Sequence, residues 1–138
     1  MTLNLSNDHS CMNCKLEPTS VGESIEIERI DFRKAAKKKI ADIMQNGVKR
    51  ENQELDVELI ICRRDDWDKL RGKRYNATLR TIAEIDNENV LVEFVLSDIE
   101  VSFDTRHLKV DDNRATISVA NITVYACGKE YGYRVIDD

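Results

Sequence analysis

Residue types that bind metals gather near the start of the chain. His9, Cys11 and Cys14 include a Cys-x-x-Cys spacing, which lets two thiolates share one Zn²⁺ ion. His9 would supply a third ligand and Cys62 or Cys127 a fourth, so the metal would hold the N-terminal segment against the folded body. The alternative is a mobile tail with unpaired thiols, because the sequence lacks the second paired motif that structural zinc sites usually show.

Catalytic chemistry has weaker support in the sequence. Thiol redox catalysis needs a helix N-terminus after the cysteine pair to stabilise a thiolate, and residues 15–18 (Lys-Leu-Glu-Pro) do not supply one. His107 has no accompanying nucleophile motif such as G-x-S-x-G, and glycine-rich phosphate-binding motifs are missing. We therefore expect no catalytic residue and no enzymatic activity, with an enzyme that uses His107 as the remaining alternative.

Two basic stretches are candidates for contact with an acidic partner, and one of them surrounds a tryptophan. Basic side chains beside an aromatic ring could bind a phosphate backbone and stack on a base. Aspartates at 65, 66 and 68 lie among them, however, and the isoelectric point of about 5.1 is unlike that of most nucleic-acid modules. Capping of one end of the core is the alternative role of the tryptophan. The candidate contact residues are Arg33, Lys34, Lys37, Lys38, Arg63, Arg64, Trp67, Arg71, Lys73 and Arg74.

Length and composition predict one domain with a real core. The chain has 138 residues, of which 41% are hydrophobic and 34% charged. Its apolar runs are shorter than the roughly 18–20 residues of a membrane-spanning helix, and its start does not resemble a secretory signal. We therefore expect a cytoplasmic protein, or one assembled into a virion, with reduced cysteines and no membrane partner.

The net charge of −5 is distributed unevenly along the sequence. Residues 29–80 hold 15 Lys/Arg and 9 Asp/Glu, whereas the segments on either side are acidic. Opposite poles of this kind favour head-to-tail self-association or a basic surface for an acidic partner. The alternative is that the two signs mix on folding and cancel.

Residues 1–24 are polar and lack a sustained period, so we expect a flexible arm there and a single folded domain over residues 25–138. An amphipathic helix is predicted after Asp31 as N-cap, with Gly47 as its stop signal. Its apolar stripe consists of Phe32, Ala36, Ile40, Ile43 and Met44.

From residue 55 the apolar period changes to two, which predicts about six strands near residues 57–62, 75–85, 90–96, 99–103, 117–124 and 131–135. Residues 86–89 are turn formers, and Gly128-Lys129 would close a last hairpin. The apolar parity slips between Val119 and Ile122, which predicts a bulge or bend. The predicted fold class is α+β and mainly β, with one helix and mostly antiparallel strands that form a small curled sheet or barrel.

The last segment, residues 122–137 (ITVYACGKEYGYRVID), resembles the closing hairpin of the small head–tail joining proteins of tailed phages. That resemblance implies a ring-forming virion component whose flexible arm orders on a neighbour. We therefore expect a non-enzymatic structural protein that acts through protein–protein contacts and self-associates into a homo-oligomer. The alternative is a small regulatory or nucleic-acid-binding β-barrel module that uses the basic 29–80 region.

Overall fold

The structure is a computed structural model that describes residues 3–5, 11–47, 52–125 and 132–136. Strands make up most of it, and an α-helix and two short 3₁₀ helices join them. In chain order the elements are β1 (Leu3–Leu5), β2 (Cys11–Pro18), β3 (Ile25–Phe32), α1 (Lys34–Asn46), β4 (Gln53–Arg63), η1 (Arg64–Leu70), β5 (Arg74–Ile85), β6 (Glu88–Phe103), η2 (Thr105–His107), β7 (Leu108–Val110), β8 (Arg114–Ile117), β9 (Ala120–Val124) and β10 (Tyr133–Val135).

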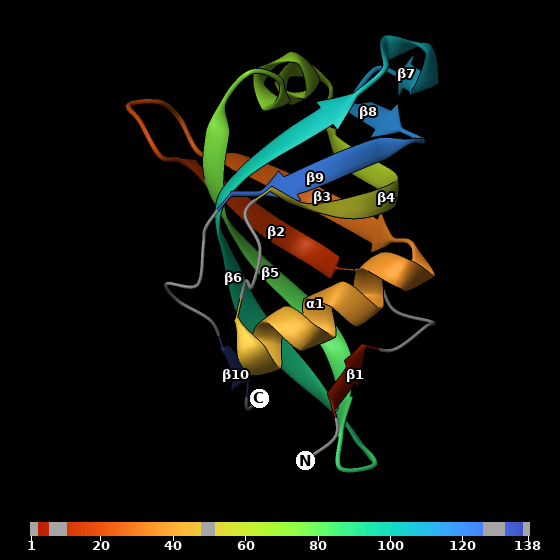
Figure 1. Ribbon diagram of the computed structural model, residues 1–138. Coiled ribbons are helices and arrows are strands. Elements are labelled where there is room, and N and C mark those ends of the chain that lie inside the picture. The colour runs from red at the N-terminus through yellow and green to blue at the C-terminus, as the bar shows by residue number, and fades with distance from the viewer. Residues whose placement is uncertain (1–2, 6–10, 48–51, 126–131, 137–138) are drawn as a thin grey trace.

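Six of these strands close into a barrel. Hydrogen-bonded neighbours follow the order β2–β3–β4–β9–β6–β5, and β5 pairs again with β2, so the ring closes on itself. Each of these pairings is antiparallel. Figure 1 shows the curled strands with η1 at the top and α1 across the lower part. The predicted fold class is confirmed, and the sheet gains further short strands where β1 and β10 flank β5 and β6 and where β7 and β8 extend beyond β4.

Inward-facing apolar side chains fill the barrel. Leu16, Ile27, Leu79 and Ile99 come from four different strands and are each almost fully buried. The cavity among such side chains measures only about 10 Å³. The barrel interior is therefore a packed core, and any binding surface on the described residues lies on the outside.

The β5–β6 hairpin is the most extensive strand pairing, and its prediction is confirmed. Ile85 pairs with Glu88 across Asp86 and Asn87, which both have positive φ angles of 50° and 69°. Two central residues with positive φ form the turn whose twist matches a hairpin. A bend is confirmed as well, but it lies earlier than predicted, because Ile117 and Ala120 are both buried whereas Val119 between them is exposed.

Helix α1 covers one end of the barrel, but it begins later than predicted. Asp31 is not its N-cap, because β3 continues to Phe32 and Asp31 pairs with Leu59 of β4. Arg33 occupies the N-cap position in an extended conformation. The predicted stop is confirmed, since Gly47 has φ 81° and its N–H donates to the carbonyl of Ile43 at 2.8 Å. No helix in the described ranges is long and apolar enough to cross a membrane.

Much of the predicted N-terminal arm belongs to the sheet. β1 pairs with β5, and β2 completes the barrel between β3 and β5. The strand pattern of β2 is interrupted at Asn13, whose φ of 54° turns both Cys11 and Cys14 inward although they are three residues apart. Asparagine tolerates this left-handed conformation better than most residues. The period of two was therefore not recognisable in the sequence.

The predicted terminal hairpin is wrong. β9 pairs with β4 and with the second half of β6, whereas β10 pairs with the first half of β6. The two strands do not pair with each other, because β6 is long enough to take both along one edge. Gly128-Lys129, the expected turn, lies outside the described residues.

Candidate interaction surfaces

A group of lysine and arginine side chains projects from the first half of α1. Arg33, Lys34 and Lys38 are exposed and have no ionic partner among the described residues, and we call them the basic patch. The first turn of the helix carries no acidic residue, and Arg33 makes no side-chain cap. Positive charge at a helix N-terminus opposes the helix dipole, so an acidic partner would stabilise this end.

The outer face of β4 and β6 carries carboxylates that sequence reasoning missed. Glu54, Asp56 and Glu58 alternate with buried Leu55 and Val57 along β4. Glu100 of β6 joins them because Glu54 and Glu100 both pair with Thr123 of the intervening strand β9. We call these four carboxylates, Glu54, Asp56, Glu58 and Glu100, the acidic face.

The carboxylates of the acidic face have no ionic partner in the part of the chain that the structure describes. Asp56 accepts a hydrogen bond from the side-chain amide of Asn121 at 3.1 Å, which is a neutral partner. The alternation Glu54-Leu55-Asp56-Val57-Glu58 was a usable signal in the sequence. The contribution of Glu100 was not, because it depends on β9 lying between β4 and β6.

The basic patch and the acidic face adjoin each other. The backbone N–H of Arg33 donates to the carbonyl of Asp56 at 3.1 Å, and the Lys39 ammonium donates to the carbonyl of Glu54 at 3.0 Å. The start of α1 is thereby held beside the outer face of β4. Two surfaces of opposite sign thus share a border on one side of the molecule.

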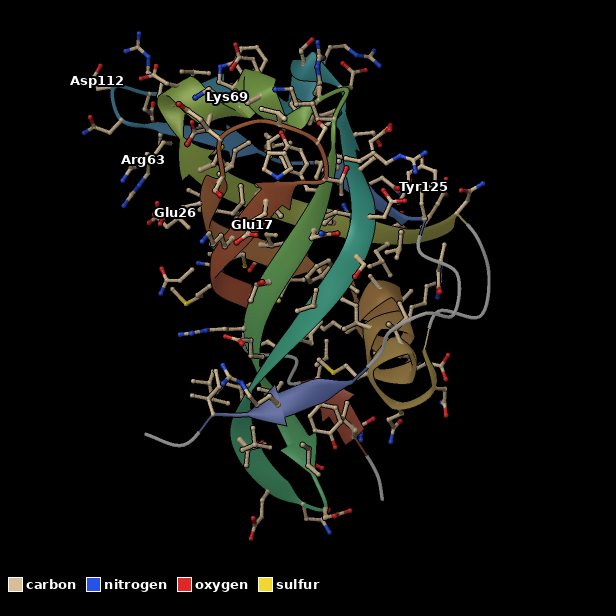
Figure 2. The ribbon with its side chains drawn as sticks, turned by 90° about the vertical axis from the view of Figure 1, so that its left-hand side faces the viewer. Glu17, Glu26, Arg63, Lys69, Asp112 and Tyr125 are labelled. Atoms are coloured by element: carbon tan, nitrogen blue, oxygen red, sulfur yellow. The ribbon has the colours of Figure 1, made fainter. Side chains whose placement is uncertain are left out.

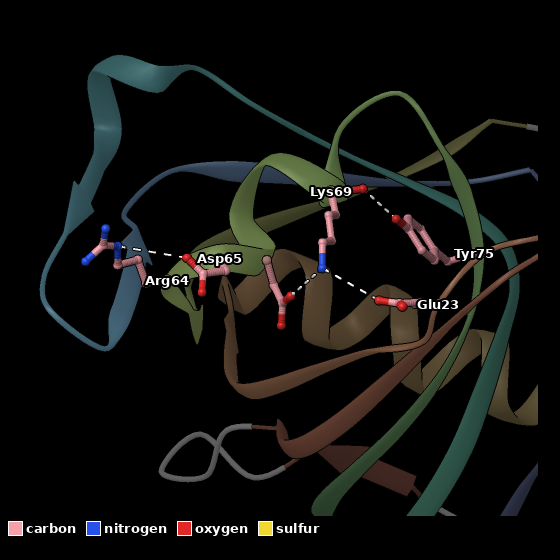
Figure 3. Close-up of polar contacts among 6 residues, drawn as sticks. Glu23, Arg64, Asp65, Lys69 and Tyr75 are labelled. Carbon is pink, nitrogen blue, oxygen red and sulfur yellow. Dashed lines mark hydrogen bonds and ion pairs between the residues drawn. The ribbon is translucent and has the colours of Figure 1, made fainter.

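The second predicted basic cluster lies around η1, where acidic residues are interspersed. Of the predicted cations, Arg64 lies 4.0 Å from Asp65. Lys69, a further cation of η1 that the prediction did not include, lies 3.3 Å from Asp66 and 3.9 Å from Glu23 (Figure 3). Arg63 and Lys73 are exposed, without an ionic partner among the described residues. In the sequence the cations around η1 and those of α1 belong to one basic region, residues 29–80. In the fold, η1 and α1 lie at different ends of the barrel (Figure 1).

The two remaining cations of this cluster, Arg71 and Arg74, have their guanidinium groups over aromatic rings. The guanidinium of Arg71 lies 5.5 Å from the ring centroid of Phe103, and that of Arg74 lies 3.5 Å from the ring centroid of Tyr125. Trp67 is half-buried, packs against the core and meets Phe103 edge-on at 6.5 Å. The alternative reading of Trp67 as a cap on one end of the core is therefore confirmed.

The charge poles of the sequence do not persist as separate regions in space. Arg80 of the basic segment pairs with Glu93 at 2.9 Å, and Arg74 pairs with Asp98 at 3.0 Å. Antiparallel pairing of β5 with β6 brings the basic and acidic segments together and mixes their charges. Charges without an ionic partner among the described residues remain in smaller areas, two of which are the basic patch and the acidic face.

An outer hollow of about 730 Å³ lies against β2, β3 and β5 and is lined by charges of both signs. Glu28 pairs with Arg114 at 2.9 Å within it. Figure 2 shows Glu17, Glu26 and Arg63 on this side of the barrel. Because the two signs alternate, the hollow does not present the single-sign lining that a simple anion or cation would select.

The predicted metal ligands lie in different surroundings from those expected. Cys11 and Cys14 are buried in β2 and Cys62 is buried in β4, while His9 and Cys127 lie outside the described residues. A side-chain hydrogen bond with Cys14, together with burial, raises the pKa of the Cys11 thiol well above its ordinary value. No group of three or more His, Cys, Asp or Glu residues suited to a metal occurs in the described ranges. The predicted zinc site stays a prediction.

His107 lies exposed in η2. Its charge contributes to lowering the pKa of Asp104 to about 2, after the hydrogen bonds that Arg106 donates to that carboxylate. The arrangement is an exposed loop stabilised by Asp104 and Arg106, whose closest contact is 2.7 Å. The described cysteines are buried inside the barrel, so His107 does not meet any of them.

No protein-family model, curated protein or solved structure matches this chain.

Proposed function

We propose that this chain is a non-enzymatic assembly module that binds further copies of itself, with the basic patch of one copy on the acidic face of another. The observation that supports the proposal is that the charges of both surfaces have no ionic partner among the described residues. All of them are exposed except the half-buried Glu100. Each surface therefore offers what the other lacks.

The shared border of the two surfaces makes self-association geometrically simple. The backbone N–H of Arg33 donates to the backbone carbonyl of Asp56, so the basic patch and the acidic face lie side by side along a common border. A twofold axis through this line places each basic patch over the partner's acidic face, and both contacts form at once. If the basic patch of each copy instead contacts the acidic face of the next copy, and the rotation between copies closes, the result is a ring.

The contact should be weak and sensitive to salt. Exposed ion pairs contribute only about 0.2–1 kcal/mol each, so several must act together. They are screened over about 10 Å at an ionic strength of 0.1 M. Association is therefore expected at high protein concentration and low salt, and dissociation at high salt.

Sedimentation velocity tests the proposal directly. The wild-type protein should sediment as an oligomer at an ionic strength of about 0.01 M and as a monomer at about 1 M. Lys34→Glu with Lys38→Glu, and separately Glu54→Lys with Glu100→Lys, should each sediment as a monomer at both salt concentrations. A wild-type protein that stays monomeric in low salt would contradict the proposal.

Matched controls separate the two surfaces from net charge. Arg63→Glu with Lys73→Glu changes the same amount of charge as the basic-patch variant, at exposed positions outside it. Glu26→Lys with Glu84→Lys changes the same amount of charge as the acidic-face variant, at exposed positions outside the acidic face. Both controls should associate as the wild type does. If they dissociate equally, the effect reflects overall charge and not these surfaces.

Nucleic-acid binding by the basic region is the second candidate, favoured by the clustering of Arg33, Lys34 and Lys38. A polynucleotide could neutralise the same three cations. The partly neutralised cluster around η1 and the neighbouring acidic face weigh against a continuous basic surface. A filter-binding titration with single-stranded DNA decides between the two, because this candidate requires binding that the Lys34→Glu, Lys38→Glu variant loses.

A role in head–tail joining of a virion would be a narrower form of the proposed assembly function. It rests on the resemblance of residues 122–137, whose expected closing hairpin is replaced by separate pairings of β9 and β10 with β6. The broader proposal of self-association does not depend on it.

A further inference from the structure

The C-terminal end of α1 carries a chemistry that is separate from the charged surfaces. Asn46 is the last residue of the helix and Gly47 follows it, which makes the one Asn-Gly pair in the sequence. In such a pair the glycine nitrogen can bond to the side-chain carbonyl carbon of the asparagine, because glycine has no Cβ to obstruct the approach. Ammonia is then released, so the pair is a candidate site of spontaneous deamidation.

The native structure holds the reacting groups away from this reaction. The backbone N–H of Gly47 donates to the carbonyl of Ile43 at 2.8 Å, which retains the proton that the nitrogen must lose. The side-chain amide of Asn46 donates to the carboxylate of Asp42 at 2.8 Å, one turn earlier. Asn46 also has the backbone angles of a helix, and closure of a flat ring requires a rotation about its Cα–C bond out of that range.

The same contacts determine how the site becomes reactive. Fraying of the last turn breaks the hydrogen bonds of Gly47 and Asn46 and frees the Asn46 backbone to rotate. Helix ends open locally at a much lower free energy than the whole protein. Ile43 and Met44 are buried against the barrel, so the helix before them stays in place. We propose that Asn46 is a deamidation site whose rate is set by opening of the last turn of α1.

The reaction is balanced with water as its co-reactant. The Gly47 nitrogen gives its proton to solvent and bonds to Cγ of Asn46. The Cγ–Nδ2 bond breaks, and that nitrogen takes a proton from solvent and leaves as ammonia. Water then adds to either carbonyl carbon of the succinimide ring and breaks its bond to nitrogen, which gives aspartate or isoaspartate. The chain gains one carboxylate, and no atom is oxidised or reduced.

The product weakens the helix that contains it. A carboxylate at position 46 replaces the amide that now donates to Asp42, and like charges four residues apart on a helix repel each other. Negative charge in the last turn also opposes the helix dipole. Isoaspartate adds a methylene to the backbone, which displaces the Gly47 N–H from the carbonyl of Ile43. Deamidation therefore converts a transient opening of the helix that covers the barrel into a permanent one.

The test is incubation of the full chain at neutral pH, with deamidation at Asn46 followed by mass spectrometry of its peptides. Asp42→Ala removes the acceptor of the Asn46 amide and should speed deamidation about 3- to 10-fold, as expected for loss of one hydrogen bond. Alanine is the best helix former, so a lower helix propensity would not be the cause. Glu84→Ala, which removes an exposed carboxylate of β5, is the control and should leave the rate unchanged.

Amide hydrogen exchange at Gly47 measures the opening itself and needs no variant. One opening should limit both reactions, so the protection of the Gly47 amide should equal the ratio of the deamidation rates in guanidinium-unfolded and native wild type. Deamidation of the native chain as fast as that of the unfolded chain would overturn the proposal. Equal rates in Asp42→Ala and Glu84→Ala would overturn it too, as would an Asn46 that persists while the Gly47 amide exchanges freely.

Discussion

The guanidinium of Arg74 lies over the ring of Tyr125, with 3.5 Å between its central carbon and the ring centroid. The same guanidinium donates to the carboxylate of Asp98 at 3.0 Å, and the backbone N–H of Tyr125 donates to the carbonyl of Asp98 at 2.8 Å. These contacts connect the start of β5, a bulge in β6 and the residue that follows β9. Arg74, whose predicted contact with a partner stays a prediction, thus joins three parts of the barrel.

Replacement of Arg74 by alanine should lower the free energy of unfolding by about 1–2 kcal/mol, because it removes a cation–π contact and an exposed ion pair together. The free energy of unfolding of Arg74→Lys should lie between those of the wild type and Arg74→Ala, since lysine keeps the charge but lacks the planar group that stacks on the ring. Urea denaturation measures both. Lys73→Ala, an exposed neighbour, is the control and should change stability by less than about 0.5 kcal/mol. Equal effects at 73 and 74 would show that the stacking contributes nothing.

Glu93 should connect stability to acidic pH. Burial raises its pKa, but the hydrogen bonds and charges of Arg80 and Arg134 outweigh burial and hold the pKa below its ordinary value. A lowered pKa contributes stability above the unfolded-state value, and this contribution is lost as the pH falls through the folded-state value. Glu93→Gln should therefore cost up to about 1 kcal/mol at neutral pH and almost nothing near pH 3, measured by urea denaturation. A cost that is independent of pH would contradict this account, and Glu84→Gln is the control.

Cys62 should connect stability to alkaline pH. Burial, with a smaller contribution from the charge of Asp66, raises its pKa from 9.0 to about 12. A raised pKa contributes stability that is complete below pH 9 and is lost between pH 9 and pH 12, because the unfolded chain releases the proton first. In that window the wild type should lose about 1.4 kcal/mol per pH unit more than Cys62→Ala does.

The control for this experiment is Val57→Ala, which also removes buried volume from β4 but carries no titratable group. Its stability should be lower than that of the wild type at every pH, with the same slope. If Cys62→Ala also kept the wild-type slope, Cys62 would not be the group that titrates.

The sequence predicted the fold class and the β5–β6 hairpin because those strands alternate regularly around an Asp-Asn turn. It did not predict β3, because the register shift between Ile27 and Arg29 changes the apolar spacing from two to three, and that spacing is also helical. It missed β2 for a related reason, the bend at Asn13. Bulges and bends give a small barrel its curvature, and they also interrupt the pattern by which strands are recognised.

The candidate surfaces were predictable only in part. Arg33, Lys34 and Lys38 at the start of α1 are exposed, because the apolar stripe of the helix leaves them on the outer side, whereas Lys37 is half-buried. The acidic face depends on Glu54 and Glu100 meeting across β9, a pairing of residues distant in the sequence. In the second basic cluster, Arg71 and Arg74 contact aromatic rings that no local pattern brings beside them, and their predicted contact with a partner stays a prediction.

Mixing two charge-reversed variants tests the proposed assembly most directly. The Lys34→Glu, Lys38→Glu protein should be monomeric in low salt, because its patch becomes net negative and repels the acidic face. The Glu54→Lys, Glu100→Lys protein should be monomeric as well, because its acidic face loses its net charge and no longer attracts the basic patch. In an equimolar mixture the unchanged acidic face of the first variant can meet the unchanged basic patch of the second. The mixture should therefore sediment as an oligomer that dissociates in high salt. A mixture that remains monomeric while the wild type associates would show that copies of this chain meet through some other surface.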